Sequence, residues 1–299
     1  LVEQMGIARF GHRPNVADVF SGSGQIPFEA ARLGCNVYAS DLNPMACLLT
    51  WGSFNIVGAP AENISNLTIA QTKLVERVQQ EIDELGIETD GKGWRAKAYL
   101  YCVEVICPES GWAVPLLPTL IVSASKFVVV NLVPIESEKR YMIEVKYCKN
   151  KNEMEMQDKP TVSGGYLIHS PSPDQEYRSK ISSIRGDIRV GRNTTSALRK
   201  WEKEDFTPRK DDIFQERLYC VQWEKVAKEK SRLETEFRSV TQADLEREAK
   251  VISYVENHFK EWQEKGYIPD MVIEKGYNTD QPIRERGWTY WHHLFAPRQ

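Results

Sequence analysis

The sequence predicts an α/β fold in which the first half of an open parallel sheet is followed by a β-rich insertion and a helical C-terminal segment. A glycine turn lies between strand-like and helix-like segments within residues 16–41. β-branched and aromatic residues are concentrated within residues 96–147, as is typical of strands. Apolar residues recur at helical spacing within residues 242–262. The predicted parts are a cofactor-binding α/β half (1–95), the insertion (96–223), and a helical and aromatic C-terminal segment (224–299).

The first part has the order strand, turn, helix, strand. Residues 16–20 form an apolar strand, and residues 26–33 form a helix with Pro27 in its first turn, where a missing N–H costs nothing. Gly34 ends this helix, and residues 36–40 form the second strand. Further helices are expected over residues 44–56 and, with clear amphipathic spacing, over residues 64–86.

The chemistry of this turn favours a positively charged nucleoside. Ligands of open α/β sheets bind beyond the carboxyl ends of the strands, and Gly22 and Gly24 allow close approach to the backbone. Pro27 replaces the third glycine of the dinucleotide pattern, which weakens that alternative. Asp41 can accept both hydroxyls of a ribose, and Asp18 suits the sulfonium and ammonium of S-adenosylmethionine. The predicted cofactor-binding residues are Asp18, Phe20, Gly22, Gly24, Asp41 and Asn43; the alternative is a purely structural turn.

The pattern from Asp18 to Gly24, followed by Asp41-Leu-Asn-Pro44, resembles amino-group DNA methyltransferases. In particular, it is similar to a family of large adenine-specific DNA methylases that carry a zinc-ribbon insertion. The resemblance implies a partial Rossmann-like methyltransferase sheet, S-adenosylmethionine as cofactor, DNA as partner, and methylation of adenine N6, plausibly in restriction-modification. Further segments that resemble this family lie at residues 93–112, 184–187, 212–220 and 277–293.

The chain departs from that family at the catalytic motif. Enzymes of this class hold the flipped adenine with a D/N-P-P-Y/F/W tetrapeptide, and this sequence has no Pro-Pro pair. We therefore expect an incomplete chain that is inactive alone, with unknown catalytic residues and with the missing catalytic half of the same protein as a partner. The alternatives are a non-catalytic nucleic-acid-binding or assembly module, and a methyltransferase that acts on RNA or a small molecule.

The ribbon is also degenerate. Its C-P-x-C-G pattern becomes Cys107-Pro-Glu-Ser110-Gly, and the downstream pair is reduced to His169. A structural zinc ion needs four nitrogen or sulfur donors, so Cys107 and His169 alone are too few. The expectation is a β core that folds without zinc.

Any nucleic-acid contact must come from a local patch, because the chain has a net charge of −3. Basic residues gather between residues 178 and 200 with a single acid, Asp187, among them, and arginines in turns suit phosphate contacts. A solvated loop is the alternative. The nucleic-acid candidates are Arg178, Lys180, Arg185, Arg189 and Arg192.

Composition sets the remaining limits. No apolar run approaches the ~20 residues that span a bilayer, and the first residues lack the features of a secretory signal. Six cysteines occur without framework spacing, which favours reduced thiols. We therefore expect a cytoplasmic protein without membrane partners.

Overall fold

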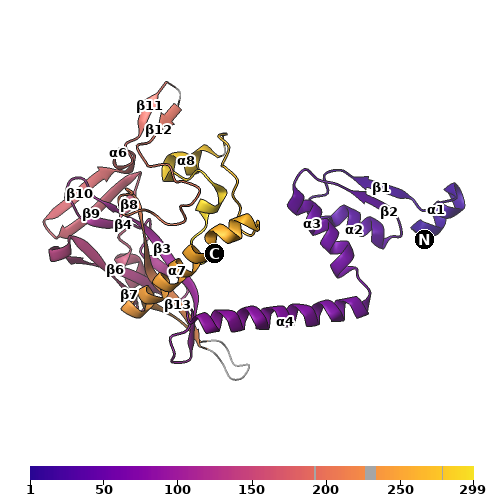
Figure 1. Ribbon diagram of the computed structural model, residues 1–299, viewed down its shortest axis with the longest axis horizontal. Coiled ribbons are helices and arrows are strands. Elements are labelled where there is room, and N and C mark those ends of the chain that lie inside the picture. Colours follow the sequence, from indigo (N-terminus) through magenta and orange to yellow (C-terminus); the bar gives the residue numbers. More distant parts are fainter. Residues whose placement is uncertain (192, 226–233, 278) are drawn as a thin grey trace. The chain divides into compact units, whose positions relative to one another are not determined.

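The computed structural model describes residues 1–191, 193–225, 234–277 and 279–299. The chain divides into two compact units, Leu1–Glu81 and Ile82–Gln299. The fold is mixed α/β, as the sequence predicts (Figure 1). The boundary between the units lies within a helix, whereas the sequence predicted a first boundary at residue 95. The second unit includes both the predicted insertion and the predicted C-terminal segment.

The first unit confirms the predicted order of strand, turn, helix and strand. β1 and β2 pair in parallel, with Asp18 opposite Ala39. The Asn43 side chain caps the next helix by accepting a hydrogen bond from the Met45 amide at 3.0 Å, and Pro44 occupies the first turn. The elements are α1 (Val2–Phe10), β1 (Asn15–Asp18), α2 (Gln25–Arg32), β2 (Asn36–Ala39), α3 (Pro44–Gly52), the π-helical turn η1 (Ser53–Val57) and α4 (Ala61–Leu85), which continues past the boundary.

The first unit buries few apolar side chains. Ala46 and Pro27 are buried, but Phe20 is 84% exposed and Leu42 is 97% exposed. The apolar stripe of α4 is also open, since Leu74 is 64% exposed. The amphipathic helix predicted for residues 64–86 is therefore confirmed as a helix, while much of its apolar face remains in contact with solvent.

The second unit is organised around a seven-stranded mixed sheet with the order β14-β13-β3-β4-β7-β6-β5. Its longest pair joins β3 and β13, which are far apart in sequence, in antiparallel register. The strands are β3 (Trp94–Ile106), β4 (Ala113–Leu116), β5 (Ile121–Ser123), β6 (Val128–Ile135), β7 (Arg140–Tyr147), β13 (Gln215–Lys225) and β14 (Thr235–Ser239).

A smaller sheet of β8, β9 and β10 lies within the predicted β-rich insertion (Figure 1). Gly164 and Gly165 join β8 to β9 in a two-residue turn in which both have positive φ, 57° and 79°. This conformation explains the glycine pair, because L-residues rarely adopt it. The remaining elements are α5 (Lys151–Gln157), β8 (Val162–Ser163), β9 (Tyr166–Ser172), β10 (Gln175–Lys180), α6 (Ile181–Ile184), β11 (Ile188–Val190) and β12 (Asn193–Thr195).

Leu167 on β9 connects the two sheets of this unit. Its side chain is fully buried and packs in one cluster with Val105, Val114 and Tyr141 of the large sheet. Burial of a side chain of this size stabilises the folded state by about 1.5–3 kcal/mol. The small sheet is therefore part of the core of the second unit.

A buried carboxylate also ties three strands of the large sheet together. Glu104 on β3 accepts hydrogen bonds from Arg140 on β7 at 2.7 Å and from Arg217 on β13 at 2.5 Å. The Glu104 side chain is only 8% exposed, so its charge depends on these two partners.

The C-terminal part of this unit is helical. Helix α7 (Gln242–Glu264) follows the cap residue Thr241, whose hydroxyl and main chain form a capping box with Asp244. Gly266 follows the end of the helix with a φ of 73°. After α7 come α8 (Asp280–Arg286) and a 3₁₀ turn (Trp291–Leu294). Within the described residues, no helix has the length and apolar character to cross a membrane.

Candidate functional site

The predicted cofactor turn lies at the carboxyl ends of β1 and β2. The Ser40 amide donates to the Asp18 carbonyl at 2.9 Å, and the Ser21 amide donates to the Ser40 carbonyl at 3.0 Å. These bonds extend the parallel ladder beyond the strands. Asp18 and Asp41 consequently lie at the same edge of the sheet, which is where open α/β sheets bind ligands.

Asp41 organises this turn. Its two carboxylate oxygens accept hydrogen bonds from the Gly22 amide at 2.9 Å and from the Asn43 amide at 2.8 Å. The bond from Asn43, followed by that from Gly22, lowers the pKa of Asp41 below its usual value. Each oxygen keeps further acceptor capacity, so the carboxylate can still receive ribose hydroxyls.

The two glycines have different surroundings. A Cβ atom at Gly22 would meet nothing within 4 Å, so the space next to this residue is open. At Gly24 a Cβ atom would lie 2.7 Å from the Thr50 hydroxyl of α3, so this glycine allows the turn to pack against that helix. Only Gly22 therefore offers backbone that a ligand can approach.

The other predicted cofactor residues surround the turn. Asp18 accepts a hydrogen bond from the Phe20 amide at 3.2 Å. The Phe20 ring is exposed, and Asn43 is occupied as the cap of α3. The residues present suit S-adenosylmethionine, because an ordered carboxylate, an exposed ring and open backbone meet at one edge.

The predicted nucleic-acid residues separate into two kinds. Arg178 and Lys180 are exposed on β10, and the Arg178 guanidinium lies 4.3 Å from the centre of the Tyr166 ring. Arg185 instead pairs with Asp187 at 2.7 Å and its side chain is 14% exposed. Arg189 is exposed on β11, and Arg192 lies outside the described residues.

The ribbon positions come together as a hydrogen-bonded cluster. His169 Nε2 lies 3.0 Å from the Ser110 hydroxyl, and its Nδ1 lies 3.0 Å from the Tyr141 hydroxyl. Cys107 Sγ lies 3.8 Å from the Ser179 hydroxyl. Burial lowers the pKa of His169 and raises the pKa of Tyr141 to about 12.

This cluster does not fit a structural zinc ion. Both ring nitrogens of His169 have hydroxyl partners, and Cys107 adds one sulfur where four strong donors are needed. Across the part of the chain that the structure describes, no group of three or more His, Cys, Asp or Glu residues could hold a metal ion.

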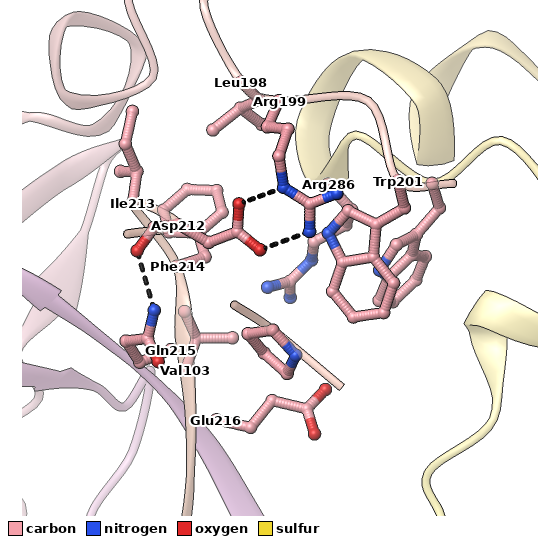
Figure 2. A pocket seen from close by; sticks show the side chains of 12 residues that line it. Val103, Leu198, Arg199, Trp201, Asp212, Ile213, Phe214, Gln215, Glu216 and Arg286 are labelled. Atoms are coloured by element: carbon pink, nitrogen blue, oxygen red, sulfur yellow. Dashed lines mark hydrogen bonds and ion pairs between the residues drawn. The ribbon is translucent and has the colours of Figure 1, made fainter. Parts of the chain in front are cut away.

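Sequence reasoning missed a cleft beside the small sheet. Its lining brings Lys180 and Arg185 together with Arg286 of α8, and the Tyr166 ring contributes to it. Arg286 also lines a neighbouring small cavity, where Figure 2 shows it near the Arg199–Asp212 ion pair. No motif joins these positions, and only the fold brings Arg286 to β10. We call the first of these spaces the Lys180–Arg286 cleft.

Comparison of the chain with protein-family models, with curated proteins and with solved structures finds no match.

Proposed function

We propose that the first unit binds S-adenosylmethionine as part of a DNA methyltransferase that acts on adenine N6. The observation that carries the proposal is the Asp41 carboxylate, which is fixed by two backbone amides next to the open backbone of Gly22. A ribose would bind to Asp41, and the cationic methionine end would face Asp18. Methyl transfer would be a direct attack of the amine on the sulfonium methyl, without a covalent enzyme intermediate.

We propose that the D/N-P-P-Y tetrapeptide comes from the missing catalytic half of the same protein, which would also complete the sheet. A two-stranded parallel sheet supports this, because parallel sheets are normally covered on both faces. The exposed apolar residues of the first unit are consistent with such a partner.

A second candidate function is a non-catalytic nucleic-acid-binding module that keeps the sheet as a scaffold. The exposed Arg178 and Lys180 on β10 favour this candidate, because they do not depend on the glycine turn. Methyl-transfer assays with unmethylated DNA, RNA and small amines, on the full-length natural protein, distinguish the candidates. Transfer to DNA supports the first, and transfer to none supports the module.

Calorimetry with S-adenosylmethionine tests the cofactor site directly. Asp18→Asn is a clean variant, because the amide oxygen can still accept from the Phe20 amide while the charge is lost. We expect Asp18→Asn and Asp41→Asn each to weaken binding by about tenfold or more, as for a lost hydrogen bond to a charged group.

Glu29→Gln is the matched control, because Glu29 is an exposed acid on α2 that pairs with Arg32. This variant should bind as the unaltered protein does. Heat with NADH but none with S-adenosylmethionine would refute the proposed cofactor.

A further inference from the structure

We propose that the Lys180–Arg286 cleft binds the phosphodiester backbone of nucleic acid. The choice of nucleic acid as ligand rests on the proposed function, and the cleft adds the location of the contact. Its lining residues include the cations Lys180, Arg185 and Arg286 and the single acid Glu285. This local excess of positive charge contrasts with the net charge of −3 of the whole chain.

The three cations are not equivalent. Arg185 is paired with Asp187 at 2.7 Å and with Glu285 at 3.7 Å, so acids of the protein already balance its charge. Lys180 and Arg286 form no side-chain hydrogen bond or ion pair with any residue that the structure describes. Two cations that line the same cleft therefore have the capacity to bind an anion.

Arg286 forms no ion pair with a described residue, although the carboxylates of Glu216 and Glu285 are near enough to raise its pKa against the larger effect of burial. Its guanidinium lies 5.6 Å from the ring centres of both Phe214 and Trp288, and these two contacts stabilise its position. Burial lowers its pKa, which reflects the cost of removing a charge from water. A guanidinium presents several N–H groups in a planar fork that matches phosphate oxygens. A phosphate therefore stabilises this partly buried guanidinium by more free energy than it would a fully solvated arginine.

A row of cations extends from the cleft along β10. Arg178 and Lys180 are two positions apart and therefore lie on the same face of the strand. Both cations lie over the Tyr166 ring, at 4.3 Å and 5.8 Å from its centre. A line of positive charges that continues into a cleft favours a polyanion over a single small anion.

Fluorescence anisotropy with a labelled DNA duplex and the matching single strand tests the proposal on the full chain. We expect Lys180→Gln and Arg286→Gln each to weaken binding by about tenfold and to reduce the slope of log affinity against log salt by about 1. Lys159→Gln is the matched control, because Lys159 is exposed and lines no part of the cleft. It should leave both quantities unchanged.

Lys180→Gln keeps the proposal open to refutation if Arg286→Gln fails to fold, because the Lys180 side chain is exposed. Wild-type affinity and salt slope in Lys180→Gln would overturn the proposal. Binding to anionic lipid vesicles with the same sensitivity, in place of DNA, would also overturn it. Calorimetry with S-adenosylmethionine on the same samples separates the two proposals, since loss of cofactor binding alone refutes only the proposed function.

Discussion

The two units differ in how they bury apolar side chains. All five buried apolar clusters identified among the described residues lie in the second unit. In the first unit, Leu48 and Trp51 of α3 are 56% and 55% exposed. The difference shows that a local sequence pattern can specify strands and helices without providing a core for them.

Sheet topology explains the difference. The second unit has mainly antiparallel neighbours, and several of them, such as β6 and β7, are joined by short connections. The first unit has only one parallel pair, and each strand has an unpaired edge among the residues that the structure describes. This single pair therefore gives the apolar helices of the first unit little sheet surface to pack against.

Separating the units tests this contrast most strongly. We expect residues 82–299 to unfold in one cooperative thermal transition when produced alone, because they contain the buried clusters. Residues 1–81 alone should show no cooperative transition by circular dichroism or calorimetry. A sharp transition in the isolated first unit would contradict the contrast.

Matched leucine substitutions give the next largest effect. Leu167→Ala should lower the free energy of unfolding by about 2–5 kcal/mol, because it leaves a cavity between the two sheets of the second unit. Leu48→Ala on the exposed face of α3 should change it by less than about 0.5 kcal/mol. Urea unfolding of the full chain measures both. Equal losses would mean that Leu48 is packed in solution.

The third prediction concerns how the stability of the second unit depends on pH. Burial, with His292 nearby, lowers the pKa of His293 to about 4, and its Nδ1 accepts hydrogen bonds from the Thr289 and Tyr290 amides. The unfolded chain therefore binds more protons between pH 6.5 and pH 4, so stability is complete above pH 6.5 and falls as the pH falls. Lowering the pH from 6.5 to 5 should cost about 2 kcal/mol from this residue.

His293→Asn should flatten this dependence, because Asn does not titrate and its oxygen can still accept from the backbone amides. His12→Asn serves as the control, since His12 is exposed in the first unit. Thermal unfolding of the full chain at a series of pH values makes the measurement. An unchanged pH profile in His293→Asn would refute the assignment.

The sequence predicted elements well where a local signal existed. The glycine pattern at Gly22 predicted the turn, and the helical spacing within residues 242–262 predicted α7; the structure has both. The strands β8 to β12 were not predicted. β10 reads Gln-Glu-Tyr-Arg-Ser-Lys, and such a polar strand shows no apolar alternation because much of it faces solvent.

The candidate sites were also predicted only where the evidence was local in the sequence. Spacing alone predicted that Asp18 and Asp41 would share one edge of a sheet, because parallel strands place their carboxyl ends together. It could not predict that Arg185 is already paired with Asp187 and Glu285, or that Arg286 would reach β10. Such contacts depend on tertiary packing between distant segments.

The Glu104 carboxylate constrains how this sequence can diverge. Replacing Arg140 or Arg217 alone weakens the compensation of a buried negative charge, and replacing Glu104 alone leaves two cations facing each other. Each single replacement therefore gives a less stable protein, whereas replacement of all three residues by apolar ones leaves no unpaired charge. Descendants of this sequence should therefore keep the three residues together or lose them together.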